Sequence, residues 1–308
     1  MRKLLFWVLG VFILASCSQD KQVYMFTSFN EPATDGLRLL YSYDGYNWTD
    51  AGCILLKPEV GTTDKVMRDP SIVRGPDGTY HFVWTSGWQG DKGFGYSSSK
   101  DLISWTTPQH IGVMEHEPEA VNVWAPEIFY DTVGKQYIII WATTIPFKFK
   151  KGIEDENNNH RMYYTTTEDF KTFSKAELFL DPGFSVIDAA IVDRGKDDYV
   201  LVLKDNTRPN RSMRVAFSKD ALGSYTNVSE TFTPLFTEGP SILKLGDEYL
   251  IYFDAYREGY YGAVKTEDFK KFTDISNEVH FPKGHKHGTV FMSTQKVLNG
   301  VLKHCERK

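Results

Sequence analysis

The stretch T-E-G-P-S-I at Thr237–Ile242 opens the unit from which most of the chain is built. An acidic residue stands just before a Gly-Pro corner, and after a turn at Leu245–Asp247 comes an apolar run, Tyr249–Phe253. A further run at Tyr260–Thr266 and a closing element, E-D-F-K-K-F-T at Glu267–Thr273, complete the unit. Short runs rich in aromatic and β-branched residues between Gly, Asp and Lys turns predict antiparallel strands. One four-stranded sheet buries too little apolar surface to be stable alone, so it needs neighbours of its own kind.

The closing element recurs along the chain, which indicates a repeat. Its copies end on aromatic residues spaced by roughly 47 to 68 positions, within reach of propeller-blade periods. These aromatic anchors are Trp48, Trp105, Phe173, Tyr225 and Phe272. Five imperfect copies of a four-stranded unit predict an all-β fold, a five-bladed β-propeller. A β-sandwich is the alternative, but sandwiches do not repeat an end-of-strand aromatic residue in this way.

The repeat is out of step at the two ends of the chain. Val23–Asp50 carries three strand-like runs and an aromatic anchor, but no acid-bearing opening strand precedes it. At the other end, H-K-H-G-T-V-F-M at His285–Met292 looks like an opening strand without followers. We therefore expect this C-terminal strand to complete the first blade, so that residues 23–308 form one closed domain. Leu298–Lys308 would then be a tail, able to form a short helix on the rim.

The N-terminus resembles a secretory signal. Residues 1–16 begin with basic side chains, continue with the apolar run Leu4–Leu14 and end on small residues. That run is shorter than the about 20 residues of a membrane-spanning helix. L-A-S-C at Leu14–Cys17 resembles the bacterial lipobox, in which Cys17 would be lipidated; an ordinary cleaved signal is the alternative. We expect an outer-membrane lipoprotein of a Gram-negative bacterium with residues 17–22 as a tether and the lipid as its only membrane contact.

Composition excludes several other classes of protein. A net charge of −5 gives no electrostatic footprint for nucleic acid. We expect the protein to be a monomer. Aromatic residues make up 15% of the chain, which suits both blade packing and sugar stacking. Apart from Cys17 there are only Cys53 and Cys305, too few for a metal cluster or a disulfide scaffold. They could pair in an oxidising compartment, but two separate buried thiols are the favoured interpretation.

The predicted opening strands carry acidic residues where a propeller's inner strands enter its central channel. Asp69, Glu127, Asp188, Glu238 and His287 are expected to converge there, with Asp69, Asp188 and Glu238 at the same phase of the repeat. Any one acid could simply cap a strand end. Three unpaired carboxylates in one funnel are costly, however, and therefore indicate chemistry. Hydrolysis of a glycosidic bond needs one ionised carboxylate, one protonated carboxyl and a neighbour that tunes the second.

The ordered motifs resemble glycoside hydrolase family 43 over nearly the whole mature chain. They are R-D-P-S-I at Arg68–Ile72, W-A-P-E-I at Trp124–Ile128, V-I-D-A-A at Val186–Ala190, T-E-G-P-S-I at Thr237–Ile242 and H-G-T-V at His287–Val290. The resemblance implies a five-bladed propeller and a mostly inverting arabinofuranosidase, xylosidase, arabinanase or galactanase. Families 32 and 68 share the propeller but retain configuration, and their N-D-P-N-type first motif is missing here.

Roles follow from the resemblance, position by position. Asp69 resembles the general base, Asp188 the pKa modulator and Glu238 the general acid. His287 resembles a histidine near the propeller axis that helps many members hold a calcium ion, although a hydrogen-bonded core histidine is the alternative. No cofactor is required for the chemistry itself. Glu127 departs from the frequent Asp of its motif, which favours a structural or substrate-positioning role.

Further residues near the inner strands are candidates for substrate binding. Trp124 and Phe184, beside the starts of acid-bearing strands, are preferred over Trp84 and Arg257. The remaining candidates are Trp88, Trp141 and Tyr256. Two polar insertions at Lys148–Arg161 and Asp205–Arg211 could wall off the cleft and favour an exo-acting pocket, or could be solvated loops.

Together these observations predict an exo-acting, inverting enzyme that releases terminal α-L-arabinofuranose from plant cell-wall polysaccharide. A β-xylosidase or galactanase of the same family is an alternative. The other alternative is a surface lipoprotein that binds glycan without cleaving it.

Overall fold

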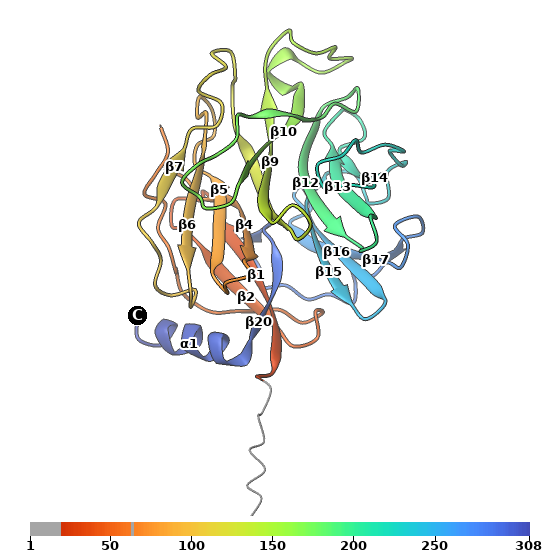
Figure 1. The fold of residues 1–308 in the computed structure, drawn as a ribbon. Coiled ribbons are helices and arrows are strands. Elements are labelled where there is room, and N and C mark those ends of the chain that lie inside the picture. Colours follow the sequence, from red (N-terminus) through yellow and green to blue (C-terminus); the bar gives the residue numbers. More distant parts are fainter. Residues whose placement is uncertain (1–19, 63–64) are drawn as a thin grey trace, which may run out of the picture.

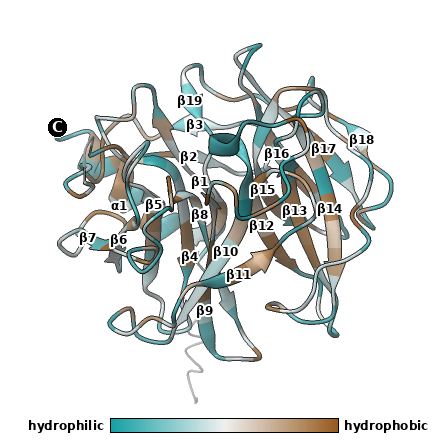
Figure 2. Ribbon diagram, turned by 90° about the horizontal axis from the view of Figure 1, so that it is seen from above, coloured by the Kyte–Doolittle hydropathy of each residue, from teal (hydrophilic) through white to brown (hydrophobic). Residues whose placement is uncertain are grey.

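Five antiparallel sheets surround a common axis (Figure 1). The computed structural model describes residues 20–62 and 65–308 of the chain. The five-bladed propeller is therefore confirmed, and seen along a second direction its strands are largely hydrophobic while the connecting loops are mostly hydrophilic (Figure 2).

Blades two to five each follow one continuous segment, and their strands pair in chain order. Blade two contains β4 (Arg68–Arg74), β5 (Tyr80–Thr85), β6 (Phe94–Ser99) and β7 (Gln109–Ile111). Blade three contains β8 (Trp124–Asp131), β9 (Gln136–Thr144), β10 (His160–Thr167) and β11 (Glu177–Leu180), with the 3-10 turn η1 (Glu156–Asn158) before β10. Blade four contains β12 (Val186–Asp193), β13 (Tyr199–Asp205) and β14 (Ser212–Ser218). Blade five contains β15 (Thr237–Leu245), β16 (Glu248–Ala255), β17 (Tyr260–Thr266) and β18 (Thr273–Asp274).

Blade four differs from the predicted four-stranded unit. Its sheet has three strands, and where an outer strand would lie the chain is joined to β14 by the isolated bridge between Phe217 and Thr226 and by hydrogen bonds from the Ser229 and Phe232 N–H groups. The aromatic anchor Tyr225 is nevertheless buried, and it packs with the blade-four core residues Leu201 and Ala216. The anchor thus keeps its packing role although its strand has been reduced to a bridge.

Blade one is built from both ends of the chain, as predicted. It contains β1 (Gln22–Asn30), β2 (Arg38–Ser42), β3 (Thr49–Asp50), β19 (His285–Lys286) and β20 (Val290–Thr294). The two C-terminal strands pair with β1 on either side of the interruption at His287–Thr289. Because β1 and β20 pair from Gln22 to Phe26, the chain closes its ring with a five-residue antiparallel register.

The recurring closing element has a shared local structure. In every blade, an Asp two residues after a Ser or Thr accepts backbone N–H hydrogen bonds from the following residues, so that the chain turns at the end of the third strand. The five turn residues are Asp44, Asp101, Asp169, Asp220 and Asp268. In the first of these turns, burial alone would raise the pKa of Asp44, but the hydrogen bonds to Asn47, Tyr46 and Ser42 lower it to about 2. Each turn is therefore held by hydrogen bonds to its Asp and precedes the aromatic anchor of its blade.

A C-terminal helix packs across the junction between the first two blades. Helix α1 (Gln295–Cys305) starts at Thr294, whose hydroxyl accepts a hydrogen bond from the Val297 N–H. Leu298 and Val301 are fully buried in one cluster with residues of blades one and two, such as Val23 and Phe82. The expected short helix is thus confirmed, and it begins three residues earlier than the predicted tail.

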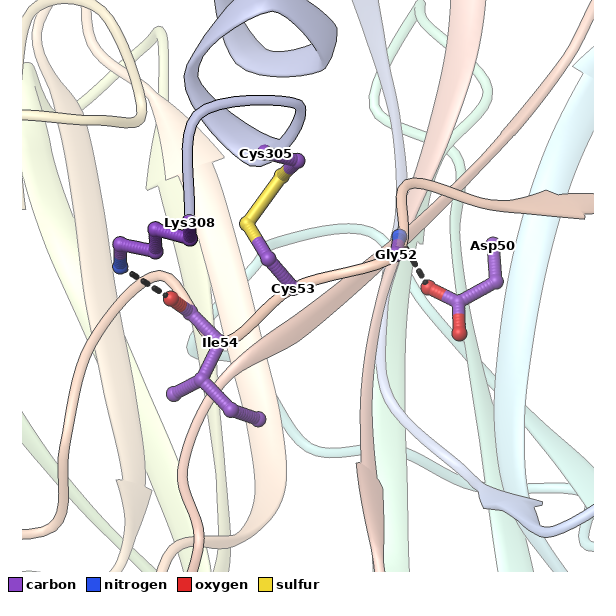
Figure 3. Close-up of a disulfide and its surroundings, with 6 residues drawn as sticks. All are labelled: Asp50, Gly52, Cys53, Ile54, Cys305 and Lys308. Carbon is purple, nitrogen blue, oxygen red and sulfur yellow. Dashed lines mark hydrogen bonds between the residues drawn. A yellow bond between two sulfur atoms is a disulfide. The ribbon is translucent and has the colours of Figure 1, made fainter.

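The prediction of two separate buried thiols is wrong. Cys53 and Cys305 form a disulfide across 252 positions of sequence (Figure 3), and their Cα atoms are 5.3 Å apart, within the usual range. The chain end is also held by a hydrogen bond from Lys308 Nζ to the Ile54 carbonyl, 2.8 Å long. The pairing arises because α1 folds back onto blade one and brings Cys305 beside the segment that follows β3.

The N-terminal predictions lie outside the described residues. The signal at residues 1–16 and the lipidation site Cys17 both belong to the part of the chain that the structure does not describe. Among the residues that it does describe, α1 is the single α-helix, and no helix is long and apolar enough to cross a membrane.

Candidate active site

The inner strands of four blades share a β-bulge at the end that carries the acids. The pairing register shifts between Arg68 and Ser71, Trp124 and Glu127, Ile187 and Ala190, and Glu238 and Ser241. The residue within each bulge has a left-handed backbone, with φ of 50° at Asp69, 47° at Ala125, 48° at Asp188 and 61° at Gly239. Such a conformation is costly for residues other than glycine and is concentrated at functional sites. A bulge re-aims side chains, here at the mouth of the channel.

This alignment corrects the predicted phase. Asp69 and Asp188 occupy the bulge position itself, whereas Glu238 precedes its bulge residue and corresponds to Arg68. Glu127 lies two positions further along its strand than the bulge residue Ala125. The acids converge on one region, but they reach it from three different positions of the repeat.

A pocket of ≈ 350 Å³ lies at this mouth, and we call it the funnel. Asp69, Asp188, Glu238 and His287 all line it, together with Trp124. The other lining residues are Arg68, Trp88, Asn158, Ile187, Lys204, Asn206, Arg211 and Tyr256. The three catalytic candidates of the sequence are therefore brought together in one cavity of a size suited to small ligands.

Asp69 is held as an ionised carboxylate. Its Oδ2 accepts a 2.8 Å hydrogen bond from the Thr85 hydroxyl, and its Oδ1 lies 2.9 Å from His287 Nε2. Burial alone would raise the pKa of Asp69, but His287, the positive charge of Arg68 and the Thr85 hydroxyl lower it to about 2. Burial alone would lower the pKa of His287, yet contacts with Asp254 and Asp69 raise it well above its ordinary value. The two side chains therefore form a buried pair of opposite charges.

Asp188 has the opposite tendency. Its Oδ2 accepts a 3.1 Å hydrogen bond from the Gly239 N–H, and the residue is only 8% exposed. Burial raises the pKa of Asp188 to about 6, with the charges of Glu238 and Asp69 adding to the increase while His287 and Lys204 oppose it. Asp188 thus gains or loses its proton near neutral pH. It lines the funnel together with two other carboxylates, Asp69 and Glu238.

Glu238 is paired with a lysine that the sequence analysis did not single out. Lys204 on β13 donates to Glu238 Oε2 across 2.7 Å, and its side chain is only 3% exposed. Burial alone would lower the pKa of Lys204, but Glu238 and Asp188 raise it above its ordinary value. The sequence did contain a signal, because Lys204 directly follows the apolar run Tyr199–Leu203 and lies in the same buried strand. A buried charge needs a partner.

Glu127 lies deeper along the channel than the funnel. It borders a separate cavity with Asp69, Asp188 and His287, and its Oε2 accepts a 3.1 Å hydrogen bond from the Thr289 hydroxyl. Burial raises the pKa of Glu127 to about 7, although hydrogen bonds from Ser71 and Thr289 oppose the shift. Its position beneath the funnel suits a structural role better than contact with substrate.

Of the predicted aromatic contacts, Trp124, Trp88 and Tyr256 line the funnel, whereas Trp84, Trp141 and Phe184 do not. Trp124 stacks on Trp88, which is 46% exposed, with ring centroids 4.8 Å apart, and its Nε1 donates to the Trp88 carbonyl. Trp84 and Trp141 are fully buried, so the prediction that Trp84 binds substrate is wrong. Gly95 beneath Trp84 has no room for a side chain, since a Cβ would lie 2.0 Å from that indole.

Phe184 and Arg257 lie outside the funnel lining. Phe184 packs against the core of blade four, beneath the guanidinium of Arg214 at 5.5 Å. Arg257 is exposed and lies 3.5 Å from the centroid of the Phe236 ring, while its neighbour Tyr256 does line the pocket. Neither predicted contact with substrate is supported by these positions.

The two polar insertions form a common wall of the funnel. Asn158 comes from the first insertion, and Asn206 and Arg211 come from the second. The loops are linked to each other, because Asn206 Nδ2 donates to Asn158 Oδ1 at 3.1 Å and the Arg208 N–H donates to Glu154 at 2.8 Å. In Figure 1 the first insertion, which follows β9, lies at the end of the molecule away from α1.

A metal site at His287 can be tested against the neighbouring side chains. Glu238, Asp254 and His287 offer ligand atoms within 4.8 Å of one another. However, Lys204 Nζ lies 2.7 Å from Glu238 and Lys286 Nζ lies 3.2 Å from Asp254. A calcium site prefers six to eight oxygen ligands, and two ammonium groups oppose a divalent cation. These three side chains do not fit such a cation as they stand, and calcium near the axis stays a prediction.

The geometry of a five-bladed propeller with three convergent carboxylates defines the class of a glycoside hydrolase, and comparison with known families agrees. A family model described as a probable glycosyl hydrolase domain, of the type related to family 43, matches residues 20–299. The chain therefore belongs to this family of glycoside hydrolases related to family 43.

Individual relatives are distant. An α-L-arabinofuranosidase of Bifidobacterium longum subsp. longum is 24% identical over 148 residues, which cover 41% of this chain and 14% of that enzyme. An α-L-arabinofuranosidase from Lactobacillus brevis is similar in structure, with a TM-score of 0.54 at 18% identity, covering 68% of this chain and 72% of the other. A thermostable family-43 glycoside hydrolase gives 0.56 at 14% identity, covering 72% and 78%. These structural likenesses support the fold.

Proposed function

We propose that the protein is an inverting, exo-acting glycoside hydrolase that releases terminal α-L-arabinofuranose from plant cell-wall polysaccharide. The observation that carries the proposal is the funnel, in which an ionised Asp69 and the carboxyl group of Glu238 lie on either side of His287. His287 Nε2 is 2.9 Å from Asp69, and its Nδ1 is 3.9 Å from Glu238. An imidazole between the two carboxyl groups favours the wide spacing of inverting enzymes over the about 5 Å of retaining ones.

In this mechanism Asp69 draws a proton from the water that attacks the anomeric carbon. Its low pKa, about 2, keeps it in the form that accepts a proton at every working pH. Glu238 gives a proton to the leaving oxygen on the opposite side of the sugar. Asp188 accepts a hydrogen bond from the N–H of Gly239, the residue directly after Glu238. In this mechanism its negative charge tunes Glu238 as the proton donor.

Exo action is supported by the wall of the funnel. The linked insertions close one side of the pocket through Asn158 and Asn206, while the Trp88–Trp124 pair offers an aromatic surface for a sugar ring. Arabinofuranose is favoured because two relatives named above are arabinofuranosidases. A β-xylosidase and enzymes acting on β-1,3-galactose linkages are also among the similar structures, so the same pocket has to be tested with those sugars.

The test is proton NMR of the first-formed sugar during hydrolysis of nitrophenyl arabinofuranoside, xyloside and galactoside, followed by branched arabinan, xylan and arabinogalactan. We expect free arabinose whose anomeric configuration is opposite to that of the substrate. A product that keeps its configuration would contradict the inverting mechanism. Release of xylose or galactose alone would move the assignment to those activities, and binding without release of any sugar would favour a glycan-binding protein.

The role of Glu238 as proton donor can be tested by comparing substrates with different leaving groups. Glu238→Gln should lose most activity on polysaccharide but much less on a dinitrophenyl glycoside, whose leaving group needs little protonation. Equal losses on both substrates would contradict the role of Glu238 as the acid.

We further propose that the mature protein is anchored to the outer membrane through lipidated Cys17. The support is the L-A-S-C sequence after an apolar run too short to span a membrane. In a Gram-negative host, Cys17→Ala should move the protein from the membrane to the soluble fraction, while Cys53→Ala should stay in the membrane. A wild-type protein found wholly in the soluble fraction would contradict the anchor.

A further inference from the structure

Lys204 is a buried cation that lines the funnel. It lies on β13 opposite Ile187 of the inner strand β12, and the residue is 2% exposed. Its ammonium group is 2.7 Å from Glu238 Oε2 and 4.8 Å from the centre of the Tyr256 ring. The aromatic face and the carboxylate together compensate the burial of this charge.

The pairing conflicts with the needs of a proton donor. An ammonium group that donates a hydrogen bond to a carboxylate stabilises its ionised form. A carboxyl group that must protonate a leaving oxygen needs the neutral form. Both demands fall on Glu238, so the contact with Lys204 has to weaken before Glu238 can act.

Glu238 is otherwise surrounded by charges of both signs. His287 on the segment between β19 and β20 lies 3.9 Å away, and Asp254 faces Glu238 across the β15–β16 pair. The other charged or titratable groups of the surrounding elements are Arg68 and Asp69 on β4, Asp188 on β12, Arg211 before β14, Tyr256 after β16 and Tyr261 on β17. Lys204 is the cation in direct contact with it, whereas Arg68 is paired with Glu31 at 2.7 Å.

We propose that Lys204 is a positioning residue that keeps Glu238 ionised and oriented while no substrate is bound. When a sugar binds, the ammonium group of Lys204 donates its hydrogen bond to the sugar instead of to Glu238. The inference rests on the function proposed above. Released from Lys204 and left among Asp188 and Asp254, Glu238 takes up a proton from solvent. That proton passes to the leaving oxygen while Asp69 receives one from the attacking water. When the product leaves, Asp69 returns its proton to solvent and the ion pair between Lys204 and the ionised Glu238 forms again.

The kinetic test compares the pH dependence of kcat/KM, which reports the free enzyme, with that of kcat, which reports the substrate complex. In the wild type the alkaline limb of kcat should lie at higher pH than that of kcat/KM. Lys204→Met should move the kcat/KM limb upward by roughly 1–3 pH units, the usual effect of removing an adjacent opposite charge. Lys204→Arg should keep the wild-type limb, because it keeps the charge.

A matched control removes a lysine elsewhere. Lys265→Met breaks an ion pair with Glu248 at 3.4 Å on blade five and takes no part in the funnel, so both limbs should stay in place. If Lys204→Met leaves the kcat/KM limb where it is in wild type, Lys204 is merely structural and the proposal is overturned.

A second measurement separates this inference from the proposed reaction. Carbon-13 NMR of Glu-labelled protein, with the Glu238 signal identified by its loss in Glu238→Gln, follows the carboxyl group without any turnover. Lys204→Met should shift the midpoint of that signal to higher pH, and Lys265→Met should not. An unchanged midpoint refutes the role of Lys204 whatever the substrate is, whereas a shifted midpoint in a protein that hydrolyses none of the tested glycosides refutes the proposed function instead.

Discussion

We use the term seam for β1, β19, β20, α1 and the Cys53–Cys305 disulfide, where the ring closes. The inner strands differ in geometry between the funnel and the seam. At the funnel, four inner strands are bulged, and left-handed residues turn carboxylates towards one another. At the seam, β20 pairs with β1 in an unbroken register, and α1 buries Leu298 and Val301 against it. The funnel collects buried charges, which are costly, and the seam collects apolar area and a covalent link, which are stabilising. Changes at the funnel should therefore alter activity first, and changes at the seam should alter stability first.

The largest effect is expected from removing the seam. Deletion of residues 285–308 removes β19 and β20 from β1, which keeps only β2, exposes the free edge of β1 and removes Phe291, Leu298 and Val301 from the core cluster. We expect a protein without a cooperative melting transition by circular dichroism. Deletion of residues 306–308, which retains α1 and the disulfide, is the control. A long deletion that melts like the full chain would show that the ring closes without its C-terminal strand.

The largest effect at the funnel is expected from Asp69→Asn. Every substrate needs the activated water, so kcat/KM should fall by about 10²–10⁴-fold on polysaccharide and on activated glycosides alike. The melting temperature should fall at neutral pH, because the variant removes the charge that is paired with the buried His287 cation at 2.9 Å. Activity that survives on substrates with good leaving groups would assign Asp69 a role other than the base.

The disulfide gives the intermediate effect. Cys53→Ala with Cys305→Ala should lower stability by about 2–4 kcal/mol, because the bond closes a loop of most of the chain. Thermal melts should shift by several degrees, and kcat at 25 °C should stay unchanged because the bond lies at the seam. A reducing agent should lower the melting temperature of the wild type and should not change that of the double variant. Equal melting of oxidised and reduced wild type would contradict a stabilising bond.

The smallest effect is expected at Glu127, beneath the funnel. Its pKa of about 7 lies above the unfolded value of about 4.3, so the folded protein loses stability as the pH rises through this interval. Glu127→Gln removes that loss. The variant should melt at a higher temperature than wild type at pH 8, and the difference should vanish near pH 4. A difference that does not depend on pH would contradict a protonated Glu127 in the native state.

The part of the site that the sequence predicted is the part encoded locally. Asp69, Asp188 and Glu238 stand out because each immediately precedes or begins an apolar strand in a recurring motif, and repetition alone implies convergence. Trp84 was proposed because it flanks the inner strands and was misassigned, since successive strand residues face opposite sides and the Trp84 side chain faces the core. Lys204 has its meaning only opposite Glu238, 34 positions away on the next blade.

The sequence by itself determined the five-bladed ring, its closure by both chain ends and the carboxylates at the inner strands, because periodic burial and turn residues are local properties of the chain. The tertiary structure alone decided the pairing of Cys53 with Cys305, the unequal phase of the acids and the cation beside Glu238. These features depend on where α1 folds back, where each pairing register slips by a bulge, and which side chain of one blade meets the next. Such contacts join residues far apart in sequence, and no local pattern records them.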